Sequence, residues 1–84
     1  MYFVYILKCR DGTLYTGITT NLDRRVGEHN SLTKGAKYTR ARRPVELVYS
    51  KKFRSRSNAS KEEARIKSLT RAEKLLFMKG FKNK

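Results

Sequence analysis

The sequence predicts an α+β fold, in which a small three-stranded antiparallel sheet is flanked by about three helices in the order ββαβαα. Three observations support this class. Two apolar segments rich in aromatic and β-branched residues enclose the turn signal Asp11-Gly12. A third segment, starting at Val45, alternates apolar and polar residues. Capping residues precede the segments with helical spacing. The 84 residues allow one domain, spanning residues 1–84.

The N-terminal elements are predicted to be a β-hairpin and a helix. The apolar segments Tyr2 to Cys9 and Leu14 to Thr20 are its expected strands. Asn21 can cap the helix that follows, because its side-chain oxygen can accept a hydrogen bond from a free backbone N–H. We expect that helix to run through about Asn30.

The length of the hairpin loop decides which tyrosines share a face of the sheet. A two-residue loop, Asp11-Gly12, puts Tyr5 and Tyr15 on opposite faces. A three-residue loop with Gly12 in the left-handed conformation pairs Tyr5 with Gly17 and puts both tyrosines on one face. Glycine is the residue that the three-residue loop favours at its third position. A functional interpretation of the tyrosines requires this longer loop.

The middle of the chain is predicted to be a loop followed by a strand. Residues 31–44 are polar and basic and end at the only proline, Pro44, which indicates a long basic loop. Residues Val45 to Phe53 then alternate, which predicts a strand with Val45, Leu47 and Tyr49 on one face.

Two helices are predicted at the C-terminal end. Ser57 or Asn58 can cap the first, which is expected to run to about Leu69. Residues 70–73, Thr-Arg-Ala-Glu, form a capping box, in which the Thr and Glu side chains each satisfy a free backbone N–H of the other. The last helix is therefore expected to run from Arg71 to about Lys79.

Helical periodicity separates the two adjacent arginines of the first helix. One face of this helix carries Leu22, Val26 and His29, with Arg25 on its shoulder. Arg24 and Glu28 are expected to point elsewhere. An arginine turned toward a sheet needs an anionic partner, which is either a structural carboxylate or a bound phosphate.

The helix after the third strand offers two adjacent carboxylates. Ala59, Ile66 and Leu69 define its inner face, and Glu62 and Glu63 straddle that face. Periodicity places Glu62 nearer the centre and does not single out Glu63. Either glutamate is also favoured in a first turn by the helix dipole.

Charge and cysteine content restrict the class of protein. The chain carries a net charge of +14, of which residues 1–30 hold +1 and residues 31–84 hold +13. This asymmetry predicts a polyanionic partner, with nucleic acid favoured over a membrane surface. No apolar run approaches the ~18 residues that span a bilayer. The single cysteine, Cys9, forms no internal disulfide, and we expect a cytoplasmic protein.

Several of these residues together resemble the GIY-YIG nuclease domain, and in particular its small stand-alone bacterial members. The resemblance covers nearly the whole chain. It rests on Phe3-Val4-Tyr5, on Tyr15-Thr16-Gly17, on residues 21–25 with His29, on residues 34–40 and 44–49, and on Ala59, Glu63, Ile66 and Lys67. Phe3-Val4 stands where the first motif has Gly-Ile, while the tyrosine is kept.

The resemblance implies a divalent-metal-dependent endonuclease that hydrolyses phosphodiester bonds in DNA, with a single Mg²⁺ or Mn²⁺ as cofactor. Glu63 matches the metal ligand. Tyr5 matches the general base, with Tyr15 beside it. Arg25 matches the residue that stabilises the phosphate, and His29 positions a tyrosine or relays a proton.

The basic residues are expected to follow the nucleic-acid backbone, which gives affinity without sequence information. Those of the loop are Lys34, Lys37, Arg40, Arg42 and Arg43, and those of the C-terminal helices are Lys67 and Arg71. We find no motif of a sequence-reading element, so we expect weak or structure-influenced specificity, or an unknown protein partner that supplies it. The alternative is a basic nucleic-acid-binding module, for DNA or RNA, whose site is vestigial.

Overall fold

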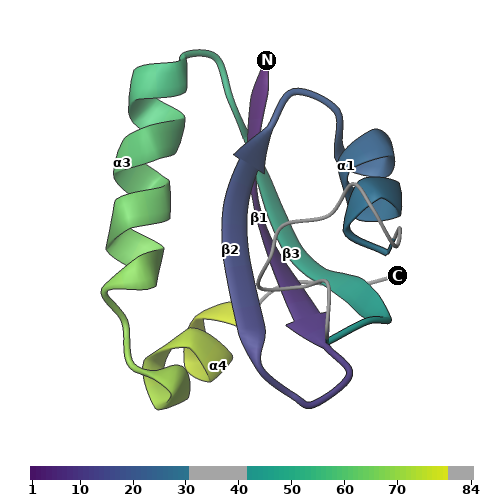
Figure 1. The fold of residues 1–84 in the computed structure, drawn as a ribbon. Coiled ribbons are helices and arrows are strands. Elements are labelled where there is room, and N and C mark those ends of the chain that lie inside the picture. The colour runs from purple at the N-terminus through teal and green to yellow at the C-terminus, as the bar shows by residue number, and fades with distance from the viewer. Residues whose placement is uncertain (31–41, 80–84) are drawn as a thin grey trace.

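The computed structural model describes residues 1–30 and 42–79 and has the predicted order of elements (Figure 1). Three strands form one antiparallel sheet in the order β2-β1-β3. The strands are β1 (Tyr2–Cys9), β2 (Leu14–Thr19) and β3 (Val45–Phe53). The helices are α1 (Leu22–His29), α3 (Arg56–Lys67) and α4 (Arg71–Lys79). Residues 31–41 of the predicted loop at residues 31–44 lie outside the described residues.

The hairpin has the three-residue loop. Tyr5 pairs with Gly17, and Leu7 pairs with Tyr15. Gly12 has a φ of 87°, a left-handed conformation that glycine adopts at little cost, and its N–H donates to the carbonyl of Cys9. Tyr5 and Tyr15 therefore lie on the same face of the sheet.

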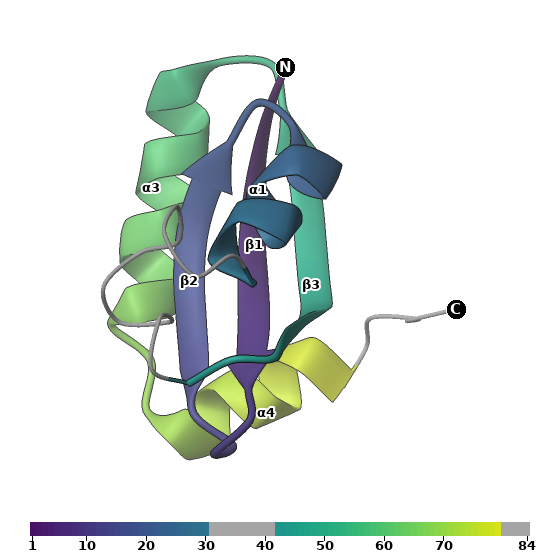
Figure 2. The same ribbon diagram turned by 45° about the vertical axis from the view of Figure 1, so that its right-hand side comes forward.

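Each face of the sheet is covered by a helix from a different part of the chain. The face under α1 holds a cluster built on Tyr5, Leu7, Cys9 and Val45. The face under α3 holds a cluster built on Val4, Ile6, Tyr49, Ala59 and Ile66. Figure 2 shows α1 in front of β1, α3 beside the outer edge of β2 and α4 below the sheet. Strand β1 is central, so its residues contact both layers.

One prediction about β3 is wrong. Val45 and Leu47 pack in the cluster under α1, but Tyr49 packs in the cluster under α3. Ile6 pairs with Tyr49 while its neighbour Leu7 pairs with Leu47, so one residue of β3 is skipped. This bulge reverses the alternation of side chains along the strand.

The helix ends differ from the predicted ones by small amounts. Helix α3 begins at Arg56, because Ser55 and not Ser57 or Asn58 supplies the capping oxygen, which accepts from the backbone N–H of Asn58 at 3.1 Å. It ends at Lys67, before the predicted Leu69. Strand β2 and helix α1 each end one residue earlier than expected.

The capping box before α4 is confirmed. The backbone N–H of Thr70 donates to Glu73 Oε1 at 2.8 Å, and the backbone N–H of Glu73 donates to Thr70 Oγ1 at 3.1 Å. Among the described residues, no helix is long and apolar enough to cross a membrane.

Candidate active site

The face of the sheet under α1 brings three aromatic residues together from three different elements. Tyr5 of β1, Tyr15 of β2 and His29 of α1 have ring centroids 5.0 to 6.4 Å apart. Tyr5 is 1% exposed and His29 is fully buried. The Tyr5 ring lies against Gly17, where a Cβ atom would come within 2.5 Å of the phenol oxygen. The absence of a side chain at Gly17 is therefore what lets the Tyr5 hydroxyl reach across β2.

The Tyr5 hydroxyl and His29 form a buried hydrogen bond. The oxygen lies 2.9 Å from His29 Nε2. His29 reaches it because it is on the inner face of α1, where Leu22 and Val26 also pack against the sheet, as the periodicity predicted. The end of α1 is fixed by Asn30, whose side chain accepts from the backbone N–H of Val45 and donates to its carbonyl.

Burial shifts the pKa values of both groups so that the neutral forms are favoured. Burial raises the pKa of Tyr5 to about 12, and the hydrogen bond and charge of Arg25 only partly oppose it. Burial, followed by the positive charge of Arg25, lowers the pKa of His29 to about 4. At neutral pH the structure therefore holds a protonated phenol against a neutral imidazole.

Arg25 links this pair to a carboxylate. Its Nη1 donates to Glu28 Oε1 at 2.7 Å, and its guanidinium is near enough to the Tyr5 hydroxyl to lower that group's pKa. Arg24 lies 3.8 Å from the same carboxylate and is more exposed. The prediction that Arg25 leans toward the sheet with an anionic partner is confirmed, while the expectation that Glu28 points elsewhere is wrong. Glutamate three residues after an arginine on a helix is a pairing signal that could have revealed this contact.

The two glutamates of α3 face different tyrosines. The charge of Glu63 raises the pKa of Tyr5, as the smallest of several causes, whereas the charge of Glu62 raises the pKa of Tyr49 on the opposite face. Glu62 pairs with Arg65 at 2.7 Å, and Glu63 pairs with Lys67 at 3.1 Å. Glu63 is thus the carboxylate whose charge reaches the Tyr5 hydroxyl, a distinction that helical periodicity could not make.

Glu63 is a single carboxylate oxygen donor, of the kind that fits a hard divalent cation which keeps most of its water. The Glu63 side chain is 25% exposed and holds the ammonium group of Lys67, so it already attracts a cation at a surface that solvent reaches. No cluster of three or more potential ligands occurs among the described residues. Mg²⁺ is commonly held by one or two carboxylates together with water and phosphate oxygens, so a single glutamate suffices for it.

The predicted backbone-binding residues are not all placed around this site. Arg42 pairs with Asp11 at 3.1 Å, and Arg71 donates to the carbonyl of Gly12 at 2.8 Å, so both lie at the hairpin loop. Lys67 pairs with Glu63. Arg43 is half-buried beside Pro44. Lys34, Lys37 and Arg40 lie outside the described residues.

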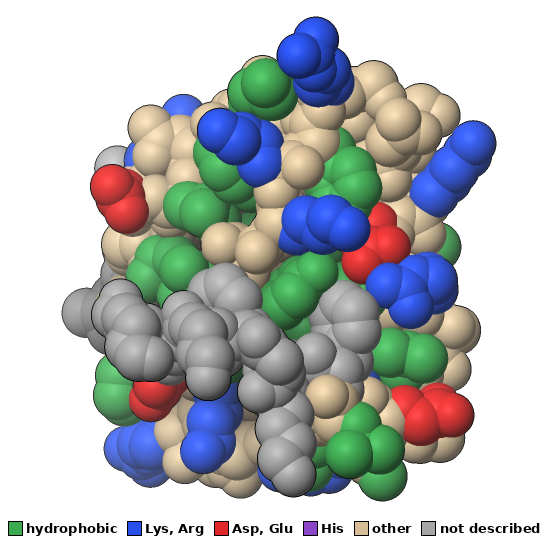
Figure 3. All heavy atoms as spheres, turned by 180° about the vertical axis from the view of Figure 1, so that it is seen from behind, with side chains coloured by type: hydrophobic (Ala, Val, Ile, Leu, Met, Phe, Trp, Pro, Cys, Tyr) green, Lys and Arg blue, Asp and Glu red, His purple; other side chains and the backbone are tan. Residues whose placement is uncertain are grey.

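Basic side chains are also spread over the side of the molecule that faces away from the viewer in Figure 1. Figure 3 shows lysine and arginine side chains on that side, with hydrophobic groups between them and acidic groups at a few positions. Net charge alone therefore does not locate the site. The location comes from the Tyr5, Tyr15, Arg25, His29 and Glu63 side chains.

These residues and the ββαβαα fold define a domain of the GIY-YIG class. The family model described as the GIY-YIG catalytic domain matches residues 1–76, and the chain belongs to this family. Family membership implies a function of the nuclease type, and nucleases of this family typically use a divalent metal.

More particularly, the chain is similar to small proteins named UPF0213. It is 60% identical over 79 residues to one from Desulfotalea psychrophila, a match that covers 94% of this chain and 72% of the relative. It is 53% identical over 81 residues to one from Streptococcus agalactiae, covering 96% of this chain and 91% of the relative.

Two solved structures share this fold. The solution structure of a UPF0213 protein from Bacillus halodurans is 48% identical, with a TM-score of 0.58 and coverage of 96% of this chain and 88% of that one. The solution structure of a protein from E. faecalis is 50% identical, with a TM-score of 0.66 and coverage of 95% and 84%.

Proposed function

We propose that this protein is a divalent-metal-dependent endonuclease that hydrolyses phosphodiester bonds in DNA. The observation that carries the proposal is the Tyr5 hydroxyl, which meets His29 at 2.9 Å and lies within electrostatic reach of both Arg25 and Glu63. An imidazole, a guanidinium and a carboxylate around one hydroxyl suit general-base and electrostatic catalysis of phosphodiester hydrolysis. A protein that only binds DNA has no need of a carboxylate at that place.

In the proposed reaction Tyr5 is the general base. It takes a proton from the attacking water as the water oxygen bonds to phosphorus and the bond to the leaving deoxyribose oxygen breaks. His29 Nε2 holds the phenol oxygen oriented through the contact at 2.9 Å, and the phenolate that acts as the base would be favoured by the positive charge of a bound cation. Tyr15 packs beside both rings and fixes their positions.

Arg25 is the proposed phosphate ligand. Its planar guanidinium offers donors in a fork that matches two phosphate oxygens, a geometry that lysine lacks. Charge that develops on the phosphoryl oxygens in the transition state would be stabilised by these donors, an effect worth about 10²-fold in rate for a single donor elsewhere.

Glu63 is the proposed ligand of Mg²⁺ or Mn²⁺, which would replace the Lys67 ammonium as the partner of the carboxylate. The bound ion supplies Lewis-acid polarisation of the phosphoryl oxygen and stabilisation of the leaving oxygen. Lys67 would then be available to the DNA backbone, together with the basic residues near the hairpin loop. Because such contacts are made to phosphate, we propose weak or structure-influenced specificity. A cytoplasmic location is part of the proposal, and the free cysteine Cys9 is compatible with that reducing compartment.

The decisive experiment compares two glutamate variants with supercoiled and branched DNA in the presence of Mg²⁺ or Mn²⁺. We expect Glu63→Gln to lower the cleavage rate by about 10²-fold or more. Glu62→Gln is the matched control, because it also removes a carboxylate paired with a cation of α3, but one whose charge acts on Tyr49. It should cleave like the wild type.

The outcomes separate the nuclease from a vestigial binding module. Cleavage that needs both the metal and Glu63 supports the proposal. DNA binding without cleavage, equal in the wild type and in Glu63→Gln, would refute it and leave a nucleic-acid-binding module with the fold of a nuclease.

A further inference from the structure

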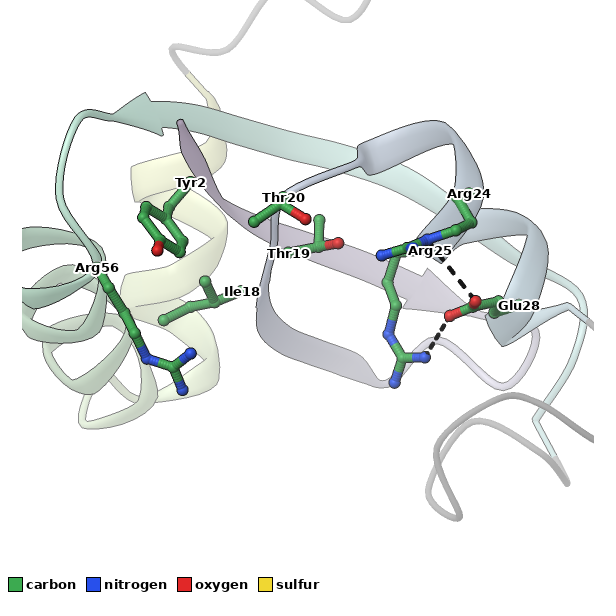
Figure 4. Close-up of a pocket in the computed structure, with 8 residues that line it drawn as sticks. All are labelled: Tyr2, Ile18, Thr19, Thr20, Arg24, Arg25, Glu28 and Arg56. Atoms are coloured by element: carbon green, nitrogen blue, oxygen red, sulfur yellow. Dashed lines mark hydrogen bonds and ion pairs between the residues drawn. The ribbon is translucent and has the colours of Figure 1, made fainter.

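We propose that the pocket between α1 and the start of α3 binds a phosphodiester group of the DNA strand, beside the one held at Tyr5 and Arg25. The pocket has a volume of about 390 Å³. Figure 4 shows the side chains that surround it, which come from both helices and from the ends of β1 and β2. The inference rests on the proposed function, because Arg25 is shared between the pocket and the cleavage site.

The side chains that line the pocket carry more positive than negative charge, as expected of an anion-binding site. Three arginines line it, Arg24 and Arg25 of α1 and Arg56 of α3, against one carboxylate, Glu28. Arginine is suited to phosphate because its fork of donors matches the oxygens of the group. Arg24 and Arg25 both contact Glu28, whereas Arg56 approaches from the other side of the pocket (Figure 4).

Arg56 occupies a position that local helix chemistry disfavours. It is the first residue of α3, and the first turn of that helix contains no acidic residue. The positive end of a helix dipole favours anionic side chains and opposes cationic ones. A cation placed there adds to the positive potential of the helix terminus, which suits an external anion. Departures from local preference of this kind are expected at functional sites.

The pocket lies next to the proposed cleavage site along β2. Gly17, under the Tyr5 ring, and Thr19, in the pocket wall, are two residues apart on the same face of the strand, which is about 7 Å. A DNA strand that places one phosphate at Arg25 can therefore place a neighbouring one between Arg24 and Arg56.

Glu28 occupies the position of a competing anion within this pocket. Its carboxylate accepts from Arg25 at 2.7 Å, so an incoming phosphate meets a negative charge next to its own ligands. Removing that charge while keeping the hydrogen bond, as in Glu28→Gln, should raise the affinity for DNA. Replacing an arginine should lower it.

The test measures binding of a fluorescently labelled DNA duplex by anisotropy, with EDTA present so that no cleavage occurs. We expect Arg56→Gln to weaken binding about tenfold, because it removes hydrogen bonds to a charged group. It should also lower the dependence of log K on log salt concentration by about one. Arg54→Gln is the matched control, because Arg54 is also exposed, two residues earlier, and not among the residues that line the pocket. It should change neither quantity appreciably.

Two further arms complete the test. Glu28→Gln should bind more tightly than the wild type, while Glu62→Gln, which also removes a glutamate paired with an arginine, should not. Binding of the duplex should persist when inorganic phosphate is added at the same molar concentration as the phosphate groups of the DNA. Equal effects of Arg56→Gln and Arg54→Gln, or full displacement of DNA by that phosphate, would overturn the inference.

Failure of this inference is distinguishable from failure of the proposed function. If Glu63→Gln abolishes cleavage but Arg56→Gln binds like Arg54→Gln, the nuclease stands and the pocket does not bind the strand. If Arg56→Gln alone weakens binding but Glu63→Gln changes nothing in cleavage, the pocket stands and the nuclease does not.

Discussion

Replacing Gly17 with alanine should displace the Tyr5 ring, which makes this substitution a direct check of the site geometry. The added Cβ atom would come within 2.5 Å of the phenol oxygen and 2.7 Å of the ring carbon Cζ. Carbon atoms in contact are normally about 3.5 to 4.0 Å apart, so one group must move by about 1 Å. Tyr5 is 1% exposed and bonded to His29, so it cannot swing into solvent at little cost.

The expected cost follows from this overpacking. Inserting a methyl group into a well-packed core destabilises a protein by about 1–3 kcal/mol. Because the contacts to the phenol also orient the proposed base, cleavage should fall by about 10²-fold, since small displacements of reacting groups cost that much. The free energy of unfolding in urea measures the destabilisation, and the cleavage rate measures the loss of activity.

Gly27→Ala is the matched control. A Cβ at Gly27 meets nothing within 4 Å, and the residue lies within helix α1. Alanine should therefore stabilise this helix by up to about 1 kcal/mol, the difference in helix propensity. Opposite signs for the two glycine-to-alanine changes support the geometry. A Gly17→Ala protein as stable and active as the wild type would show that the Tyr5 ring does not lie over Gly17.

Two further predictions concern the buried end of α1. His29 has a pKa of about 4 when folded and about 6.5 when unfolded, so the unfolded chain binds more protons between those values and stability falls as the pH falls. The free energy of unfolding measured in urea should therefore fall by about 2 kcal/mol between pH 7 and pH 5. In His29→Gln this decrease should be absent. Asn30→Ala removes two hydrogen bonds to Val45 and should cost about 1–3 kcal/mol in urea unfolding, whereas an unchanged midpoint would show that they contribute nothing.

The register of the hairpin could be predicted only together with the functional interpretation, because Asp11-Gly12 is compatible with a two-residue loop as well as a three-residue one. In the structure Gly12 has a positive φ and Asp11 does not, which fits the longer loop, and that loop pairs Tyr5 with Gly17. The shared face of Tyr5 and Tyr15 then follows from strand alternation. Similarly, the inward position of His29 follows from the spacing of Leu22 and Val26.

The face of Tyr49 could not be predicted because no local signal marks the bulge in β3. Alternation places Tyr49 with Leu47, and only the pairing with β1 reveals the skipped residue. Periodicity could not choose between Glu62 and Glu63, because both flank the inner face of α3, and the family resemblance alone selected Glu63. In the structure the charge of Glu63 acts on Tyr5 and the charge of Glu62 acts on Tyr49.

The charge balance of the site indicates what must enter it before the proposed reaction can begin. Burial is the main cause of both the high pKa of Tyr5 and the low pKa of His29, so the resting pair is neutral and a phenolate is strongly disfavoured. Arg25 opposes burial only in part, and its charge is already balanced by Glu28. A bound phosphate would balance that charge further. In the proposed reaction a bound cation would supply the positive charge that favours the phenolate, and Glu63 is the carboxylate proposed to hold it.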